Sequence, residues 1–434
     1  MARRTAMIGT GYVGLVNGVG LSDFGNYVTC TDIDSNKIAM LKKGQIPIYE
    51  PGLQEYFERN VKMERLTFSD DVDRTIQENE IIFIAVNTPF IQSKGTDLSH
   101  VESVGRRIAK NLNDYKVIVT KSTVPVGTNR WLKELIATES GHTNFDIVSN
   151  PEFLREGKAV YDFFHPDRVV IGCESERARE IMQNIYRALY LIETPFIFGD
   201  FETAELIKYA SNAFLATKIT FINQIANLCE TVGGDIHLVA KAMGMDKRIG
   251  SKFLHPGPGF GGSCFPKDTR ALVETGDKYR VDMSLVKEVI KINEQQKLRM
   301  VQKLEKSLGT LVGKRIAVLG LAFKAETDDI RESPAIPIIN ELINRGALVT
   351  AHDPQAINNA KRIFEDNVIF CSDEYEAVKN ADALMIITEW NAYRSLDLRK
   401  IKSLMQGKLI LDTRNLLEPI EVRKFGFKYE GVGR

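Results

Sequence analysis

Short apolar runs alternate with longer amphipathic stretches through the N-terminal part of the chain. This alternation predicts a parallel sheet whose two faces are covered by helices. The runs that we expect to form buried strands are Thr5–Ile8, Tyr27–Thr31, Ile81–Val86, Val117–Thr120 and Asp146–Ser149, with edge strands at Val169–Ile171 and Pro195–Phe198.

The pattern changes at about Glu202. From there to Val232 the sequence contains neither proline nor glycine, and its apolar residues recur at helical spacing. A helix of ~30 residues is ~45 Å long at 1.5 Å per residue, which is enough to link two domains. The alternative is a pair of shorter helices with a break between them.

Strand and helix patterns alternate again after Gly313. The order of strand, glycine, helix, glycine, strand and aspartate in Thr5–Asp32 returns in Arg315–Asp353. We therefore predict an α/β protein with two Rossmann-like, doubly wound domains joined by a long central helix, divided into residues 1–200, 201–300 and 301–434. The strands expected here are Arg315–Leu319, Leu348–His352, Val368–Phe370, Ala383–Thr388 and Leu409–Leu411, with helices at about Pro334–Arg345 and Tyr375–Lys379.

The first predicted strand runs into a glycine pattern. The segment Gly9-Thr10-Gly11-Tyr12-Val13-Gly14 matches Gly-x-Gly-x-x-Gly, a helix pattern follows it, and the second strand ends at Asp32. In a dinucleotide site, the first glycine permits a tight turn, the second lets the backbone approach a pyrophosphate, and the third lets helix and strand pack closely. The alternative is that these glycines serve packing alone.

The acid at the end of the second strand favours one dinucleotide over another. The carboxylate of Asp32 accepts hydrogen bonds from ribose hydroxyls and repels a 2′-phosphate, so NAD is expected rather than NADP. Lys37 offsets part of that negative charge. FAD uses the same motif and is not separated from NAD by these residues. No motif points to a metal.

Two further segments directly follow strands, on the same side of the predicted sheet as the glycine pattern. They are Val86-Asn87-Thr88-Pro89 and Lys121-Ser122-Thr123-Val124-Pro125-Val126-Gly127. Because ligands of open parallel sheets bind outside the carboxyl ends of the strands, Thr88 and Thr123 are expected to face the cofactor. Ordinary turn chemistry is the other interpretation.

Of the five cysteines, Cys264 stands in unusual surroundings. It follows a segment, His255–Ser263, that is rich in glycine and proline and is neither a helix nor a strand pattern. Such a segment leaves a thiol accessible, and Lys267 is near enough in sequence to stabilise a thiolate. Asp268 lies one turn further on if a helix begins near Pro266. A structural cysteine in a glycine-rich loop is the alternative.

The long helix pattern places Lys208 and Asn212 at positions i and i+4, on one face and among apolar neighbours. A buried lysine needs a purpose, and stabilising a developing oxyanion is one; a salt bridge or a side chain that reaches to solvent is another. Glu152 and Glu156 are spaced in the same way after the strand ending at Ser149. Either is a candidate base, although glutamate is also common in first helical turns.

Composition narrows the class of protein. Lys and Arg number 57 and Asp and Glu number 57, which argues against nucleic acid or a membrane surface as a bulk partner. The sequence has no apolar run of ~20 residues and no signal-peptide pattern. The number of cysteines is odd, their spacing is irregular and no Cys-x-x-Cys pair occurs, so the sequence suggests neither a disulfide framework nor a zinc site. We therefore expect a cytoplasmic protein.

Taken together, the motifs resemble the UDP-glucose/GDP-mannose dehydrogenase family. They occur in family order over nearly the whole chain, and within the family Gly259–Asp268 is most similar to members that act on UDP-glucose. The segments that carry the resemblance are Gly9–Gly14 with Asp32, Asn87–Pro89, Ser122–Gly127, Asn150–Gly157, Lys208 with Asn212, Gly261–Asp268, and Phe323-Lys324 with Arg331-Glu332-Ser333.

The resemblance implies an oxidoreductase that takes a primary alcohol to a carboxylate with two NAD. The C6 alcohol of UDP-glucose becomes an aldehyde, Cys264 captures it as a thiohemiacetal, and a second oxidation gives a thioester that water hydrolyses to UDP-glucuronate. Lys208 and Asn212 would hold the C6 oxygen. The catalytic residues implied are Cys264, Lys208, Asn212, Asp268, Glu152 and Thr123, with Asp268 and Thr123 orienting the water and Glu152 serving in thioester hydrolysis.

The same resemblance implies two binding sets. The cofactor set comprises Gly9, Thr10, Gly11, Tyr12, Val13, Gly14, Asp32, Lys37, Val86, Thr88, Pro89, Ser122, Thr123, Glu156, Cys264, Lys267 and Arg331. The substrate set comprises Glu152, Phe153, Leu154, Glu156, Lys208, Asn212, Arg248, Phe253, Leu254, Gly261, Phe323, Lys324 and Arg414. Arg248 resembles an arginine that reaches the partner's site in a homodimer formed through the long helices.

Other functions remain open at this point. GDP-mannose and UDP-N-acetylmannosamine are the nearest alternative substrates. A non-catalytic NAD-binding scaffold and a 3-hydroxyacid dehydrogenase with a single oxidation step are more distant possibilities; the first would not need Cys264, and the second would make one NADH per substrate.

Overall fold

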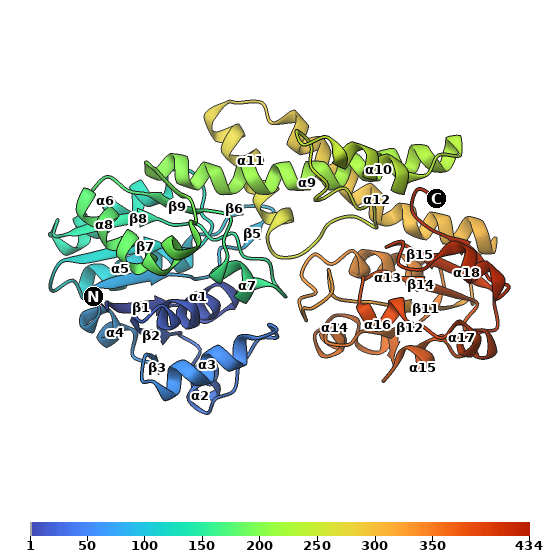
Figure 1. The fold of residues 1–434 in the computed structure, drawn as a ribbon, viewed down its shortest axis with the longest axis horizontal. Coiled ribbons are helices and arrows are strands. Elements are labelled where there is room, and N and C mark those ends of the chain that lie inside the picture. Colours follow the sequence, from blue (N-terminus) through green and yellow to red (C-terminus); the bar gives the residue numbers. More distant parts are fainter. Residues whose placement is uncertain (1) are drawn as a thin grey trace. The chain divides into compact units, whose positions relative to one another are not determined.

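The computed structural model describes residues 2–434, which divide into two compact units. Unit 1 contains residues 2–211 and Glu274–Arg280, and unit 2 contains Asn212–Val273 and Val281–Arg434. Both are built on a largely parallel sheet with helices, so the predicted α/β class with two doubly wound parts is confirmed (Figure 1).

The sheet of unit 1 has the order β10-β9-β8-β7-β4-β1-β2-β3 within the described residues. Its neighbours pair in parallel except β8 with β9. The strands are β1 (Arg4–Ile8), β2 (Tyr27–Thr31), β3 (Leu66–Ser69), β4 (Ile81–Ile84), β7 (Lys116–Thr120), β8 (Phe145–Ser149), β9 (Val169–Gly172) and β10 (Phe196–Gly199).

Two expectations about this sheet were wrong in detail, and one strand was missed. Strand β4 ends at Ile84 rather than Val86, β3 at Leu66–Ser69 had not been foreseen, and β9 is not an edge strand because β10 pairs with its outer side. The remaining expected strands of this unit lie within one residue of their predicted ends.

Alternate residues of the central strands point to opposite faces of the sheet and pack in two separate hydrophobic cores. Met7 and Phe83 pack with α1 and α3 on one face, whereas Ile8 and Ile82 pack with α5 and α6 on the other. The predicted cover of helices on both faces is therefore confirmed. The helices of this unit are α1 (Tyr12–Asp23), α2 (Ser35–Lys42), α3 (Leu53–Lys62), α4 (Val72–Glu78), α5 (Ser99–Lys110), α6 (Thr128–Ser140), α7 (Ala159–Phe164), α8 (Glu176–Ile185) and the 3₁₀ turn Arg187–Ile192, with a hairpin of β5 (Phe90–Ile91) and β6 (Gly95–Thr96).

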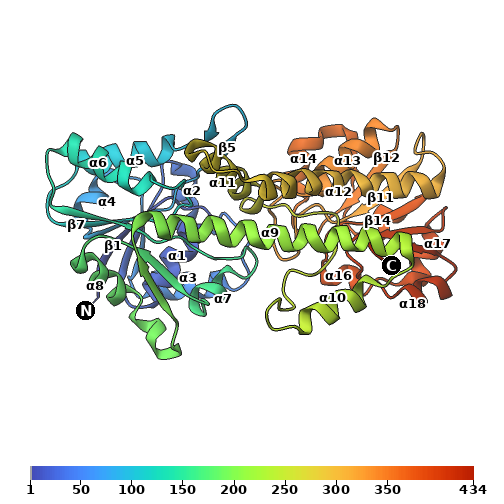
Figure 2. The ribbon, with the colours of Figure 1, turned by 90° about the horizontal axis from the view of Figure 1, so that it is seen from above.

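The long central helix exists as a single element. Helix α9 runs without a break over the 32 residues Phe201–Val232 (Figure 2), so the alternative of two shorter helices is excluded. Its expected burial was only partly correct: Lys208 and Tyr209 are buried, but Leu206 and Phe214 are exposed.

The sheet of unit 2 is parallel and has the order β13-β12-β11-β14-β15-β16 within the described residues. Its strands are β11 (Arg315–Leu319), β12 (Leu348–His352), β13 (Val368–Phe370), β14 (Ala383–Ile386), β15 (Leu409–Asp412) and β16 (Lys428–Glu430). The expected strand Ala383–Thr388 is two residues too long, and β16 had not been foreseen. The remaining helices are α10 (Ile236–Met245), α11 (Phe265–Tyr279), α12 (Ser284–Leu308), α13 (Ala335–Asn344), α14 (Ile357–Phe364), α15 (Glu374–Val378), α16 (Asn391–Arg394), α17 (Leu398–Leu404), α18 (Pro419–Lys424) and the 3₁₀ turn Glu365–Asn367.

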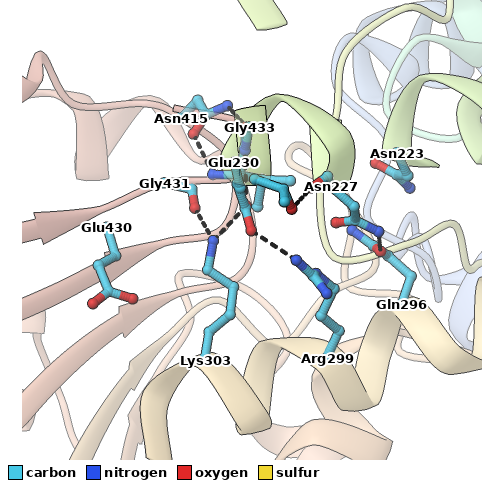
Figure 3. A network of polar contacts seen from close by, with 12 residues as sticks. Asn223, Asn227, Glu230, Gln296, Arg299, Lys303, Asn415, Glu430, Gly431 and Gly433 are labelled. Carbon is cyan, nitrogen blue, oxygen red and sulfur yellow. Dashed lines mark hydrogen bonds and ion pairs between the residues drawn. The ribbon is translucent and has the colours of Figure 1, made fainter. Parts of the chain in front are cut away.

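Within unit 2, a charged network joins α9, α12 and the last residues of the chain. The Glu230 carboxylate on α9 accepts hydrogen bonds from Arg299 and Lys303 on α12 and from the backbone N–H of Gly433 (Figure 3). Lys303 also donates to the carbonyl oxygen of Gly431. Burial raises the pKa of Glu230, but these bonds outweigh it and leave the pKa below its usual value, so the carboxylate is charged and holds both helices and the segment after β16 together.

Over residues 2–434, no helix has the length and apolar character needed to cross a membrane. The described side chains also contain no cluster of three or more His, Cys, Asp or Glu residues arranged to hold a metal ion.

Candidate active site

The turn between β1 and α1 has the geometry of a dinucleotide-binding loop. Gly9 has φ +103°, a conformation that favours glycine, and a Cβ there would strike the carbonyl oxygen of Ala85. A Cβ on Gly14 would strike the carbonyl oxygen of Gly9, whereas one on Gly11 would meet nothing within 4 Å. Gly11 is also the N-cap residue of α1, so no side chain caps the start of this helix. The loop therefore offers open space and helix N–H groups that fit a pyrophosphate.

Asp32 follows β2 directly and is tied to this loop. Its carboxylate accepts hydrogen bonds from Thr10 N (2.8 Å), Thr10 Oγ1 (2.7 Å) and Asp34 N (3.1 Å). Burial raises the pKa of Asp32, but these hydrogen bonds and the charge of Lys37 outweigh burial and leave the pKa below its usual value. A charged carboxylate at this position fits ribose hydroxyls and disfavours a 2′-phosphate, as the sequence indicated.

The open space at Gly11 leads to a test. Gly11→Ala should leave the thermal unfolding midpoint nearly unchanged but raise KM for NAD about 10-fold, because its methyl group would occupy space that the pyrophosphate needs. Gly14→Ala should instead lower stability by ~1–3 kcal/mol, since backbone must move to admit the methyl group. Steady-state kinetics and thermal unfolding measure both effects. An unchanged KM for NAD in Gly11→Ala would place the pyrophosphate elsewhere.

The loops that follow β4 and β7 are joined to each other. Thr88 Oγ1 donates to the Thr123 carbonyl oxygen (2.8 Å), and Ser122 Oγ donates to the Val86 carbonyl oxygen (2.7 Å). The two predicted cofactor segments thus lie side by side at the carboxyl ends of neighbouring strands. Glu205 on α9 holds the following turn, because its carboxylate accepts from Gly127 N (2.7 Å) and Asn129 N (2.8 Å).

Lys208 meets Glu152 in the interior of unit 1. Lys208 Nζ donates to the Glu152 carbonyl oxygen (2.6 Å) and to Glu152 Oε1 (3.1 Å), and the two side chains are only 4% and 5% exposed. The ring of Phe153 lies 5.2 Å from the same Nζ. The salt bridge that the sequence left open for Lys208 is therefore present, in a place where a nearby oxyanion would also be stabilised.

The helical interpretation of Glu152 and Glu156 was wrong. Residues 151–158 form a loop, and α7 begins at Ala159. Three N–H groups of this loop are bound by carboxylates rather than helix carbonyls: Leu154 N donates to Glu152, Arg155 N to Asp162, and Gly157 N to Glu50. Glu152 and Glu156 therefore do not share a helix face.

The glycine-rich segment before Cys264 is an irregular loop held by side-chain amides in unit 2. Asn223 Oδ1 accepts from Gly257 N (2.8 Å), Asn293 Oδ1 accepts from Phe260 N (2.8 Å), and Gln296 Nε2 donates to the Gly257 carbonyl oxygen (2.9 Å). These amides replace the backbone bonds that a helix or strand would have supplied.

Two of its glycines have a packing role that the sequence interpretation did not assign. A Cβ on Gly261 would strike the Glu332 carbonyl oxygen, and one on Gly262, at φ +85°, would lie 2.7 Å from the ring of Phe323. Gly262 N also donates to the Arg331 carbonyl oxygen (3.0 Å). The predicted residues Gly261, Phe323 and Arg331 are thus neighbours within unit 2.

Cys264 lies immediately before α11, which begins at Phe265, one residue before the expected start. Its carbonyl oxygen accepts from Asp268 N (2.8 Å), and its side chain is partly exposed. Asp268 is buried and receives Asn212 Nδ2 at 2.6 Å and Lys267 Nζ at 2.7 Å. Cys264, Asp268, Asn212 and Lys267 therefore form one cluster.

The two polar clusters share α9. Lys208, of the Glu152 pair, and Asn212, of the Asp268 cluster, stand at i and i+4 of one continuous helix and are both buried. Four of the expected catalytic residues thus fall into two hydrogen-bonded pairs, Lys208 with Glu152 and Asn212 with Asp268.

The turn after β11 resembles the turn after β1, but the aspartate that follows the next strand has different partners in the two sheets. Gly320 has φ +102°, close to the value at Gly9. Asp353, however, is buried and accepts from Leu321 N (2.7 Å), Ala322 N (3.0 Å) and Trp390 Nε1 (3.1 Å). Its carboxylate is saturated by the chain itself, which agrees with a loop that has lost the dinucleotide pattern.

The remaining predicted substrate residues occupy different environments in unit 2. Arg414 donates to the carbonyl oxygens of Ile387 (2.7 Å) and Phe323 (3.2 Å). Lys324 Nζ lies 5.3 Å from the Phe323 ring, and Leu254 is buried beside Phe253. Arg248 has an 89% exposed side chain paired with Asp246.

Several positioning residues had escaped the sequence interpretation. Their signal was present as buried polar side chains within apolar helix faces. They are Glu205 and Asn223 on α9 and Asn293 and Gln296 on α12.

Comparison with known families gives the same assignment along the whole chain. Residues 3–190, 202–295 and 317–419 match, in turn, the NAD binding, central and UDP binding domains of the UDP-glucose/GDP-mannose dehydrogenase family. The chain belongs to this family. The predicted family and its NAD cofactor are confirmed.

Individual relatives cover the chain from end to end. The UDP-glucose 6-dehydrogenase of Rhizobium meliloti (strain 1021) is 50% identical over 99% of this chain and 99% of its own. Among solved structures, a UDP-glucose dehydrogenase from the archaeon Pyrobaculum islandicum is 38% identical with a TM-score of 0.93, covering 100% of this chain and 98% of that one. A UDP-D-ManNAc dehydrogenase from Pyrococcus horikoshii is 26% identical with a TM-score of 0.88, with 99% of each chain covered.

Proposed function

We propose that this protein is a UDP-glucose 6-dehydrogenase, which converts UDP-glucose, two NAD⁺ and water into UDP-glucuronate, two NADH and three protons. The observation that carries the substrate is the 50% identity, over 99% of both chains, to a relative with that activity. The chemistry is supported by a partly exposed cysteine, Cys264, next to the buried Asn212–Asp268 pair.

NAD⁺ bound at the Gly9–Gly14 loop supplies the hydride acceptor for each oxidation. Lys208 and Asn212 bind the C6 oxygen of the sugar, and the Lys208 ammonium stabilises the negative charge that grows on this oxygen. Its resting contact with the Glu152 carboxylate keeps the ammonium oriented and buried before substrate arrives.

Cys264 retains the carbon between the two oxidations. Its sulfur adds to the aldehyde to form a thiohemiacetal, so the reactive aldehyde does not leave the enzyme. Oxidation of that adduct gives a thioester. A covalent intermediate of this kind divides a difficult conversion into two easier steps.

Water then releases the acid. Asp268 and Thr123 orient the water molecule, and Glu152 assists the proton transfer that accompanies its attack on the thioester carbonyl. The thiolate of Cys264 is the leaving group, and the carboxylate product is freed. Asp268 suits this role because Asn212 and Lys267 hold its two oxygens in fixed directions.

The proposal extends to the binding sets and the assembly. The cofactor and substrate residues predicted from the sequence bind NAD and UDP-glucose, within three domains at residues 1–200, 201–300 and 301–434 of a cytoplasmic enzyme. The chain forms a homodimer, to which Arg248 contributes. An apolar stripe on α9 supports the dimer: Phe214, Phe221 and Leu228 recur every seven residues and are 65%, 46% and 55% exposed.

The test is NADH stoichiometry with a panel of nucleotide sugars. UDP-glucose should give two NADH per molecule and turn over faster than GDP-mannose or UDP-N-acetylmannosamine. Faster turnover of either alternative would overturn the substrate. A ratio of one NADH per sugar would overturn the second oxidation and favour simple alcohol dehydrogenation.

A further inference from the structure

Unit 1 contains a buried lysine that the proposed reaction does not use. Lys121 follows β7 directly, and its side chain is buried. Its Nζ donates to Asn150 Oδ1 (3.0 Å) and to the hydroxyl of Tyr186 (3.2 Å), and that hydroxyl donates to the same Asn150 oxygen (2.8 Å). Both hydrogen-bond partners are uncharged, so no carboxylate is bonded directly to this amine among the described contacts.

Burial of this kind favours the neutral amine. A neutral lysine has two N–H donors, and the two acceptors match them, whereas a charged one has three. Burial is the main cause that lowers the pKa of Lys121 to about 7; the charge of Glu152 opposes this shift, and the charge of Lys208 adds to it. The titratable groups that face this amine are Glu152, Lys208 and Tyr186, and burial keeps the pKa of Tyr186 above its usual value.

Asn150 connects Lys121 to the Glu152–Lys208 pair. Asn150 Nδ2 donates to the Val170 carbonyl oxygen (2.7 Å), and the backbone N–H of Asn150 donates to the Thr120 carbonyl oxygen (3.0 Å). Asn150 is therefore held at its side-chain oxygen, its side-chain nitrogen and its backbone N–H, and Glu152 stands two residues further along the same chain segment. The direction of the Glu152 loop depends on this anchor.

We propose that Lys121 is a positioning residue for the Glu152–Lys208 pair, which it orients through Asn150 and whose charge it adjusts through its own protonation. This inference rests on the proposed function, because it assigns Lys121 to the same reaction. With Lys121 neutral, the negative charge of Glu152 and the positive charge of Lys208 balance each other. With Lys121 protonated, the site carries an additional positive charge, which weakens Glu152 as a base and disfavours the Lys208 ammonium.

Three variants separate this role from a structural one. Lys121→Met removes the hydrogen bonds and the charge, Lys121→Gln keeps hydrogen-bond donors without titrating, and Lys116→Met is the matched control. Lys116 begins the same strand, is equally buried, and donates to the carbonyl oxygens of Gln77 (3.3 Å) and Asn79 (2.8 Å).

We expect kcat of Lys121→Met to fall about 10- to 100-fold with little change in KM for NAD, and Lys121→Gln to recover most of kcat. The pH profile of kcat should contain an ionisation near pH 7 in the wild-type enzyme and in Lys116→Met, which is missing in both Lys121 variants. A Lys121→Met enzyme no slower than Lys116→Met, or a Lys121→Gln enzyme that keeps this ionisation, would overturn the inference.

Stability provides a second readout. The pKa of Lys121 is about 7 in the folded protein and its ordinary value is 10.5, so the unfolded chain binds the proton more tightly between these values. Folding stability from this group therefore rises as pH increases above 7. The unfolding midpoint of the wild type relative to Lys121→Met should increase from pH 6 to pH 9, and a constant difference would contradict the assigned titration.

A wrong substrate assignment would be detected separately from a wrong role for Lys121. The comparison uses whichever nucleotide sugar the wild-type protein oxidises, so a wild type inactive on UDP-glucose contradicts the substrate alone. The Lys121 comparison then proceeds with the accepted sugar.

Discussion

Cys264→Ala is expected to stop formation of UDP-glucuronate, with a loss of more than about 10³-fold in the rate of acid release. Without the thiol, the aldehyde is not captured and no thioester forms, so the second oxidation has no adduct to act on. Because the Cys264 loop is held by Asn223, Asn293 and Gln296 rather than by the thiol, the variant should fold normally.

The measurement is simultaneous counting of NADH and acid per UDP-glucose consumed. Cys173→Ala is the matched control, since Cys173 is also partly exposed but lies in unit 1 beside Ser175. Cys264→Ser tests the same step differently, because a hydroxyl can retain an ester that water removes slowly. Two NADH and normal acid release from Cys264→Ala would rule out covalent catalysis.

Lys208→Met should lower kcat by about 10²- to 10³-fold, as expected when a charge that stabilises a developing oxyanion is removed. The substitution also leaves the Glu152 carboxylate buried without its ammonium partner, and breaking such a pair costs ~3–5 kcal/mol. The single variant therefore combines a catalytic and a structural effect. These must be measured separately, by kinetics and by denaturant unfolding.

A second substitution makes the two effects distinguishable. Lys208→Met combined with Glu152→Gln removes the unpaired charge, so stability should return while kcat remains low, and lower than in Glu152→Gln alone, which measures the part of the loss that belongs to Glu152. Lys218→Met is the control on the same helix, because Lys218 donates only to the loop carbonyls of Ile249 and Gly250 among described contacts. If the double variant regained wild-type kcat, Lys208 would have a structural role only.

Four strands have the ends that the sequence predicted: Tyr27–Thr31, Arg315–Leu319, Leu348–His352 and Val368–Phe370. Arg315–Leu319 and Leu348–His352 are interior strands of a parallel sheet, where a short apolar run marks the whole strand. The missed strands, β3 and β16, lie at sheet edges, where polar residues interrupt the run. Strand β4 was predicted too long because Ala85 is apolar for another reason, its contact with the glycine loop.

By itself, the sequence determined the family, the order of the elements and the types of chemical group in the site. These follow from short-range properties: the period of apolar residues, and positions such as Gly9 and Gly262 whose backbone favours glycine. It also identified Cys264 as the thiol that packing did not explain. It did not indicate which carboxylate would meet which amine or amide.

The tertiary structure decided those pairings. Lys208 with Glu152 and Asn212 with Asp268 are each separated by 56 residues, and no local periodicity specifies such contacts. They form because the sheet aligns the carboxyl ends of its strands and because α9 presents both residues on one face. The same packing buries Lys121 next to uncharged partners, which changes an ordinary cation into a group that titrates near neutral pH.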